Sequence, residues 1–295
     1  MKFSKEDIKA MRHPSEKSRF LLTIFVLLPL GLIGILATVA SFGGLLILIP
    51  IVLFGLWFTT RFFSAMCMNN MVLISNRSFP DIFDAINDAK EAFDYKGHID
   101  AYVYQADSFN MLMMPKLRRK VILVNSAMVD GVDHQKEIRF VVGRFVGALV
   151  AKHYRFFWLK GVLSSIEKLM IFNLLLYPYE RSLQYTGDQL GLSFIGGDSK
   201  TAIRVFKKFI VGPEISDMVR TSCLLEQMEL SKGSFFAWMT RAFSSFPHLT
   251  YRIDNIQRFV TEQYPKVRAQ MEKTEITADP KSATNTDQDA SYANA

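Results

Sequence analysis

The feature that most constrains this chain is residues 20–60, which contain no Asp, Glu, Lys, Arg or His. About 20 apolar residues cross the hydrocarbon core of a bilayer, so this stretch is long enough to cross it twice. Ser41-Phe42-Gly43-Gly44, in its middle, is typical of a tight turn. We therefore predict a transmembrane hairpin of two closely packed helices, roughly 20–40 and 44–60.

A cleaved secretory signal peptide is the alternative, but its apolar region runs for only about 7–15 residues before a cleavage site. Pro29 and Pro50 do not exclude the hairpin, because spanning helices tolerate proline where neighbouring groups satisfy the freed carbonyls. The positive-inside rule predicts that both termini and the globular domain are cytoplasmic. It rests on basic residues at both flanks, namely Lys2, Lys5, Lys9, Arg12, Lys17 and Arg19 before the hairpin and Arg61 and Arg77 after it.

Composition narrows the class of protein further. A chain of 295 residues with 49% hydrophobic and 21% charged residues can bury one core beside the anchor. The formal charge of +7 suits an anionic membrane or a nucleic acid equally well, and with the hairpin we predict a bilayer and no nucleic acid. Cys67 and Cys223 cannot form a disulfide framework, which indicates a reducing compartment. Motifs typical of nucleotide binding or serine hydrolysis are absent from the sequence.

The part of the chain after the hairpin predicts a mainly α-helical domain with a small β-sheet, an α+β fold. Helical spacing of apolar residues runs from Pro80 to Gly97, and residues 136–153 form an apolar helix too short in context to be a span. Two short β-type runs, 101–105 and 121–125, flank the basic run 116–120, which is either a solvated loop or a contact with lipid headgroups.

Further along the chain, residues 156–179 are apolar and aromatic but contain charges, so we expect an amphipathic helix or hairpin at the membrane surface. Asp198 begins another amphipathic helix, and helices continue to about residue 270. The predicted organisation is a basic cytoplasmic N-terminus, the hairpin, a globular domain and a disordered polar tail, at 1–19, 20–61, 79–270 and 271–295.

Several segments of the domain, in order, resemble the HtpX-like and CaaX prenyl endopeptidase family of membrane zinc metallopeptidases. The run from Val121 to Gly143 resembles the approach to that family's active-site helix. The run 181–191, RSLQYTGDQLG, matches the frame of its E-x-x-A-D-x-x-G motif, and 245–253, SFPHLTYRI, resembles its T-H-P-x-L-x-x-R-I element. The resemblance covers most of residues 79–265 and implies a zincin-like domain.

The same resemblance indicates that the chemistry of the family is missing. Where the family has H-E-x-x-H, whose histidines hold zinc and whose glutamate activates water, this chain has Arg144, Phe145 and Ala148 at the three functional positions. Gln184 stands in place of the third ligand, a glutamate, and Phe246 in place of an accessory histidine. We therefore predict no catalytic residue, no bound metal and no cofactor, zinc being expected for the family but lost here.

Other histidines do not restore the predicted zinc site. His153 lies nine residues beyond Arg144, on about the opposite side of a helix. His134 and His248 have no partner at i+3 or i+4. We expect isolated surface or capping histidines, with His13 and His98 in solvated loops.

Asp188 is retained from the family motif, where it would support a zinc-bound histidine. Without the cation, this carboxylate needs another positive charge. We predict that Arg144 supplies it by a bidentate salt bridge, also reaches Gln184, and so cross-links two helices. Phe145 and Phe246 would fill the space that water and substrate occupy in the family. The alternative to the salt bridge is that Arg144 extends into solvent.

The sequence thus favours a non-enzymatic, membrane-anchored pseudopeptidase that binds or regulates a protein partner. Asn110 and Met111 fall at the predicted edge strand, where the family binds an extended peptide through backbone hydrogen bonds. Two alternatives stay open: a membrane zinc metalloendopeptidase with a non-standard site, and a membrane-targeting hairpin that carries an inert domain.

Overall fold

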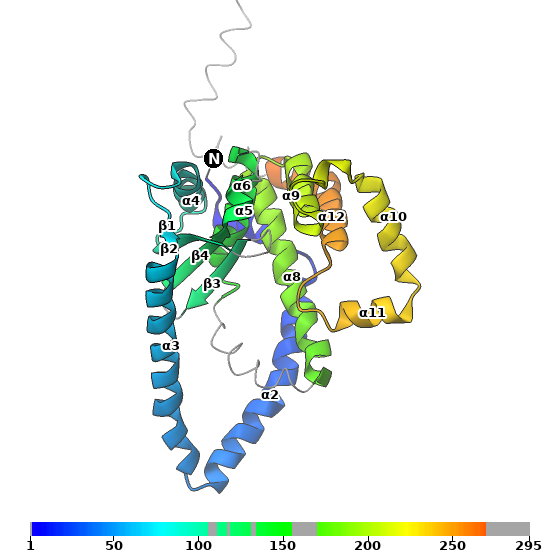
Figure 1. Ribbon diagram of the computed structural model, residues 1–295. Coiled ribbons are helices and arrows are strands. Elements are labelled where there is room, and N and C mark those ends of the chain that lie inside the picture. The colour runs from blue at the N-terminus through cyan, green and yellow to red at the C-terminus, as the bar shows by residue number, and fades with distance from the viewer. Residues whose placement is uncertain (1, 106–110, 117–118, 131–133, 155–169, 270–295) are drawn as a thin grey trace, which may run out of the picture.

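The computed structural model describes residues 2–105, 111–116, 119–130, 134–154 and 170–269 (Figure 1). Helices predominate, and one four-stranded sheet packs against them, so the predicted α+β class is confirmed. Two long apolar helices project from this globular body (Figure 1). The predicted polar tail, 271–295, lies outside the described residues.

The projecting helices are α2, Glu16–Ala40, and α3, Leu48–Asn70, joined through a turn and the short 3₁₀ helix η1, Gly44–Ile47. Each is long and apolar enough to cross a membrane, by length and composition. They diverge from the turn instead of packing closely, so that part of the prediction was wrong (Figure 1). The reason is where they are rooted, because α2 packs against α8 and α3 ends beside the sheet.

The sheet has the strand order β1-β2-β4-β3, with bounds Val72–Leu73, Ile99–Tyr104, Arg119–Asn125 and Met111–Lys116 in that order. β2 and β4 are parallel, whereas β1 and β3 pair antiparallel to β2 and β4 respectively. The β-type runs predicted β2 and β4, the resemblance placed Met111 at an edge strand, which is β3, and β1 was missed. Within the described part of the chain, β3 pairs on one side only and forms an edge.

The helices of the globular body follow the predicted periodicity at most points. The helix α4 begins at Pro80, and Asp198 caps α9 by accepting a hydrogen bond from the backbone N–H of Thr201. The core helix α6 ends at Val150, before a turn in which Lys152 has a left-handed φ of 63°. The helices are α4 Pro80–Ala92, α5 Ser126–Asp130, α6 His134–Val150, α8 Met170–Phe194, α9 Ser199–Val211, α10 Thr221–Lys232, α11 Phe235–Ala242 and α12 Leu249–Arg258, with a 3₁₀ turn η2 Ser216–Met218 and a π turn η3 Phe259–Gln263.

Two predicted segments fall partly outside the described residues. The first part of 156–179 is not described, and residues 170–179 form the start of α8. Of the basic run 116–120, residues 117 and 118 are not described, and the remainder belongs to the ends of β3 and β4.

The N-terminal segment is part of the globular core, which the division at residues 19 and 79 did not anticipate. Phe3, Ile8 and Met11 are buried in the same apolar cluster as α4 and α6. Phe3 stacks on Phe93 with 4.8 Å between ring centroids. The N-terminal segment also contains the short helix α1, Lys5–Ala10, which begins with a capping box between Ser4 and Asp7. The hairpin is therefore an insertion into one folded unit.

The helices α6 and α8 approach closely because glycines replace side chains at their contact. A Cβ on Gly147 would lie 2.7 Å from the Leu190 Cβ, and one on Gly191 would lie 2.6 Å from the backbone oxygen of Phe140. Real Cβ atoms almost never come this close to other atoms. This contact sets the distance between the two helices that carry Arg144 and Asp188.

Gly191→Ala should destabilise the fold by about 1–3 kcal/mol, because the new methyl group overpacks the contact between the helices. Gly187→Ala, four residues earlier on α8, is the matched control. Its Cβ would lie 3.6 Å from the nearest atom, an ordinary contact, and alanine gains roughly 0.5–1 kcal/mol in a helix. Thermal unfolding in detergent measures both, and equal melting temperatures would contradict the close approach.

Candidate functional site

The site lies where α6, α8 and α12 meet, around the carboxylate of Asp188. Asp188 is fully buried, and the two arginines that contact it, Arg144 on α6 and Arg252 on α12, are 7% and 6% exposed. Arg252 binds the carboxylate through two hydrogen bonds, from Nε to Oδ2 at 2.8 Å and from Nη2 to Oδ1 at 2.7 Å. A single carboxylate thus joins three helices.

Arg144 contacts the same carboxylate from the other helix. Its Nε lies 2.5 Å from Asp188 Oδ1, but the N–H is not aligned for a hydrogen bond, so the contact is an ion pair. Its Nη2 donates to Gln184 Oε1 at 3.3 Å. The predicted contacts of Arg144 with Asp188 and Gln184 are therefore confirmed, and extension of Arg144 into solvent was wrong.

The bidentate partner of Asp188 is Arg252, and the prediction of a bidentate Arg144 was wrong. In the sequence, Arg252 is the arginine of the run 245–253, which resembles the family element, and no pattern there indicates its partner. A buried carboxylate needs a positive charge, but this requirement alone does not distinguish Arg252 from Arg144 as the partner of Asp188. Arg252 and Asp188 lie 64 residues apart in the chain, so the spacing of residues within one helix gives no indication that their side chains meet.

This cluster has a net positive charge, because two guanidiniums surround one carboxylate. Burial, and secondarily the charge of Arg252, lower the pKa of Arg144 to about 10, while Asp188 opposes this shift. Arg144 remains protonated at neutral pH. Arg252 lies over the ring of Phe206 at 4.4 Å, a cation–π contact that replaces part of its lost hydration. Burial raises the pKa of Tyr154 to about 12, so its phenol is neutral beside Arg144.

The other positions assigned by the resemblance are dispersed around this cluster. Ala148 is buried one turn beyond Arg144, and Phe145 is half-buried at the edge of the core. Phe246 is 61% exposed, so the prediction that it fills a substrate space was wrong. Asn110 lies outside the described residues, and Met111 is the first residue of β3.

Among the described residues, no three His, Cys, Asp or Glu side chains are grouped so that they could hold a metal ion. At the positions that the resemblance assigns to zinc ligands, the general base and the accessory histidine, the side chains carry a guanidinium, a phenyl ring, a methyl group or an amide. None of the first three has a lone pair available to a cation, and a guanidinium does not act as a base at neutral pH. The arrangement therefore supports cross-linking of helices and not activation of water.

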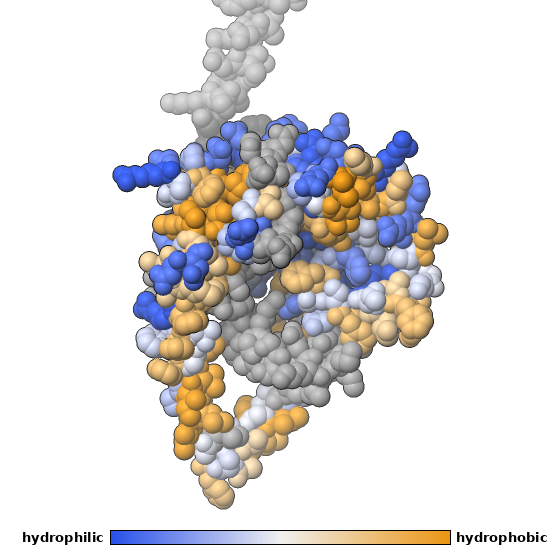
Figure 2. Space-filling model, in the orientation of Figure 1, coloured by the Kyte–Doolittle hydropathy of each residue, from blue (hydrophilic) through white to orange (hydrophobic). Residues whose placement is uncertain are grey.

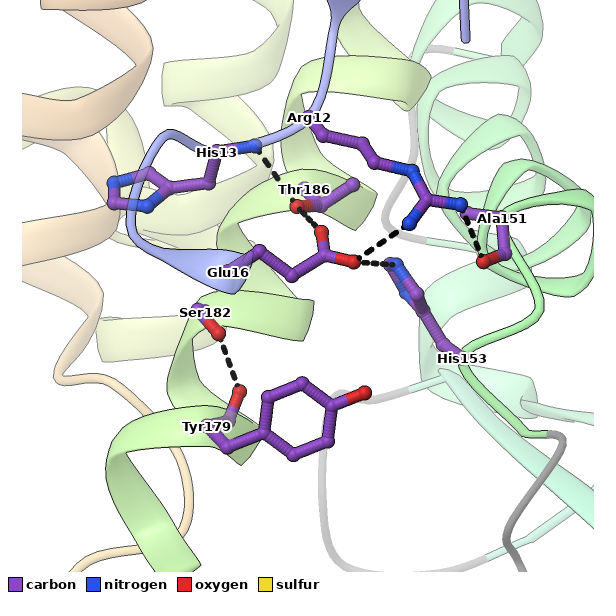
Figure 3. A network of polar contacts seen from close by, with 8 residues as sticks. All are labelled: Arg12, His13, Glu16, Ala151, His153, Tyr179, Ser182 and Thr186. Atoms are coloured by element: carbon purple, nitrogen blue, oxygen red, sulfur yellow. Dashed lines mark hydrogen bonds and ion pairs between the residues drawn. The ribbon is translucent and has the colours of Figure 1, made fainter. Parts of the chain in front are cut away.

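A second buried network joins the N-terminal segment to α8 and lies near the start of α2 (Figure 3). Glu16 Oε2 accepts a hydrogen bond from Thr186 Oγ1 at 2.6 Å, and Glu16 Oε1 accepts one from Arg12 Nη1 at 3.1 Å. Arg12 Nη2 also donates to the backbone oxygen of Ala151 at 2.8 Å. His153 Nε2 lies 3.5 Å from Glu16 Oε1.

Two histidines in this network differ from the prediction. The side chain of His153 is 4% exposed, so the assignment as a surface or capping histidine was wrong. His13 is half-buried and stacks on Tyr185 with 5.1 Å between ring centroids, so it is not in a solvated loop. His98, with a side chain 83% exposed, is solvated as predicted. Periodicity missed the network because Glu16 and Thr186 lie 170 residues apart.

Comparison of the chain with protein-family models, with curated proteins and with solved structures finds no match in any of the three. The structure itself defines the class of fold, α+β, and the buried charge cluster.

Asp188→Ala should lower the free energy of unfolding by about 3–5 kcal/mol, because it leaves two buried guanidiniums without a counter-charge. Arg144→Met should change it by less than about 1 kcal/mol, because Arg252 still neutralises Asp188 and the repulsion between the arginines disappears. Thermal unfolding in detergent compares the two variants. Equal losses in both would contradict the unequal roles of the arginines.

The protein should become less stable as the pH is lowered, partly because of His13. Burial, and secondarily the charge of Arg19, lower the pKa of His13 from 6.5 to about 4. Between these two pH values the unfolded chain binds a proton that the folded protein does not, so acidification favours unfolding. His13→Gln should therefore lose less melting temperature than the parent between pH 6.5 and 4. A parallel decline in both proteins would contradict this role.

Proposed function

We propose that this chain is a membrane-anchored pseudopeptidase, whose cytoplasmic, zincin-like domain binds a protein partner without hydrolysing it. The observation that carries the proposal is the buried cluster of Asp188 with Arg144 and Arg252. Arg144 and Asp188 stand at the positions where the resemblance implies a zinc-binding histidine and its supporting carboxylate.

The arrangement of these positions supports the resemblance as well as the loss of chemistry. Two residues that hold one metal ion must lie close together in space. Arg144 and Gln184, at two of the ligand positions, are in hydrogen-bond contact although 40 residues separate them. A charged hydrogen-bonded cluster can replace a metal as a cross-link between helices, because it also neutralises a buried carboxylate.

Membrane insertion of the hairpin is supported by the surface of α2 and α3. Phe25, Ile33 and Phe54 are each more than 60% exposed, and Figure 2 shows hydrophobic side chains along the helices that project from the body. Contiguous apolar surface of this kind marks a membrane or protein contact. We assign it to the bilayer because both helices have the length and composition of spans.

A cytoplasmic domain is supported by the way in which the hairpin is rooted. At the start of α2, Glu16 is bound to α8. At the end of α3, Cys67 is buried against Tyr102, Val121 and Leu123 of the sheet. Both ends therefore return to one folded body and lie on one side of the bilayer. The basic flanks assign that side to the cytoplasm.

The edge strand β3 supports binding of an extended segment of a partner. Among the described residues, β3 pairs only with β4, so its other side has backbone groups available for strand addition. This mode requires hydrogen bonds from the backbone and no metal. It would therefore persist after loss of the catalytic residues.

The topology can be tested with cysteines as reporters. In sealed cells, a membrane-impermeant maleimide should label Phe42→Cys, at the fully exposed turn of the hairpin, and not the native, exposed Cys223. After permeabilisation Cys223 should be labelled too. Labelling of Cys223 in intact cells would contradict a cytoplasmic domain.

The relation to zinc peptidases can be tested by restoring the family residues. Arg144→His, Phe145→Glu, Ala148→His and Gln184→Glu together should produce a protein that retains zinc after dialysis, while the parent does not. The control carries the same changes except Ala148→His, so it lacks one ligand. Metal analysis of folded protein, checked by circular dichroism, gives the readout. Equal zinc in both variants would contradict the assignment of these positions.

Partner binding can be tested by photo-crosslinking from β3 in the intact protein. A crosslinking residue at position 113 should capture a partner that the same residue at exposed Met218 does not, and a chelator should not change the result. The two alternative functions give other results. Chelator-sensitive cleavage of polypeptides by purified parent protein would favour a metalloendopeptidase, and equal crosslinks at both positions would favour a hairpin that carries an inert domain.

A further inference from the structure

We infer that a basic pocket at the root of α2 binds the phosphate group of an anionic phospholipid. The inference rests on the membrane insertion proposed above, and it adds a ligand and a site. The pocket has a volume of about 460 Å³ and lies between the N-terminal segment, the start of α2, the turn after α6 and α8.

The charge of the pocket lining is strongly positive. Four permanent cations, from Lys9, Arg12, Lys17 and Lys152, line it together with a single carboxylate, that of Glu16. Glu16 is already bound on both oxygens, by Arg12 and by Thr186. A second anion can therefore enter the pocket without displacing an existing ion pair.

Three of these cations are exposed lysines without a counter-charge in the part of the chain that the structure describes. Among the described residues, Lys9, Lys17 and Lys152 form no ion pair. The left-handed φ of 63° at Lys152 ends the helix α6, where the backbone N–H of His153 donates to the backbone oxygen of Ala148 at 3.1 Å, and it places Lys152 beside the N-terminal segment. Three cations that repel one another around one pocket favour an anionic ligand of more than one oxygen.

The position of the pocket favours a lipid over a soluble phosphate. Lys17 and Arg19 are the last charged residues before the apolar part of α2, which places this level at the headgroups of an inserted hairpin. Phe20 and Tyr179 also line the pocket and pack together, with 5.4 Å between ring centroids. Exposed apolar residues of α2, including Leu21 and Phe25, continue from there and fit an acyl chain.

The buried network of Figure 3 holds the pocket in shape. Arg12 ties the N-terminal segment to the backbone of Ala151, immediately before Lys152. The backbone N–H of His13 donates to Thr186 Oγ1 at 3.0 Å, which fixes the segment on α8. The cations therefore come from three separate segments that are already positioned before a ligand binds, which lowers the entropy cost of binding.

The test uses the full chain purified in a neutral detergent and three probes, namely phosphatidylglycerol, phosphatidylcholine and inorganic phosphate. Phosphatidylglycerol should raise the melting temperature and remain bound in native mass spectra, and the other two should not. The double variant Lys17→Glu, Lys152→Glu should bind phosphatidylglycerol at least tenfold more weakly. The control pair Lys96→Glu, Lys200→Glu makes the same change in net charge at exposed positions that do not line this pocket.

Each other outcome would overturn the inference. An equal shift with inorganic phosphate would indicate a site for soluble phosphate, and equal weakening in the control pair would indicate attraction by overall charge only. Labelling of Phe42→Cys in the Lys17→Glu, Lys152→Glu variant separates this inference from the proposed function. If phosphatidylglycerol binding fails while the hairpin remains inserted, the pocket is wrong and the anchor stands.

Discussion

The structure depends on the neutralisation of one buried carboxylate, that of Asp188 on α8. Arg252 binds it through two hydrogen bonds, and Arg144 adds an ion pair from a third helix. Removal of the carboxylate would leave two cations in a medium that solvates them poorly. The same cluster supplies both the charge that neutralises the carboxylate and a link between three helices.

The helix α8 links this cluster to the start of α2. Thr186, two residues before Asp188, binds Glu16 at the start of α2, and the preceding turns of α8 pack along α2. Glycines at the contact between α6 and α8 allow the two helices to approach closely, which brings Arg144 within reach of Asp188. A change at the charge cluster is thus expected to affect the start of α2 and the basic pocket beside it. A truncation that removes the N-terminal segment also removes core residues such as Phe3 and Met11.

Local patterns predicted the elements that they specify directly. The uncharged stretch predicted α2 and α3, helical spacing predicted α4 and α9, and β-type runs predicted β2 and β4. The pairing of Arg144 with Asp188 was found through the resemblance, together with the rule that a buried charge needs a partner. The strand β1 was missed because it has only two residues, and β3 was indicated only by the resemblance, because no local pattern marks the methionine-rich segment as a strand.

Taken alone, the order of amino acids determined two long apolar helices joined by a turn and a mainly helical domain with a small sheet. These follow from hydrophobicity, short-range periodicity and the chemistry of single side chains. Three-dimensional packing decided the rest: the choice of Arg252 as the bidentate partner, the burial of the N-terminal segment, the divergence of α2 from α3 and the convergence of basic residues on one pocket. Each of these depends on contacts between residues far apart in the chain, and no local pattern encodes which distant groups will meet.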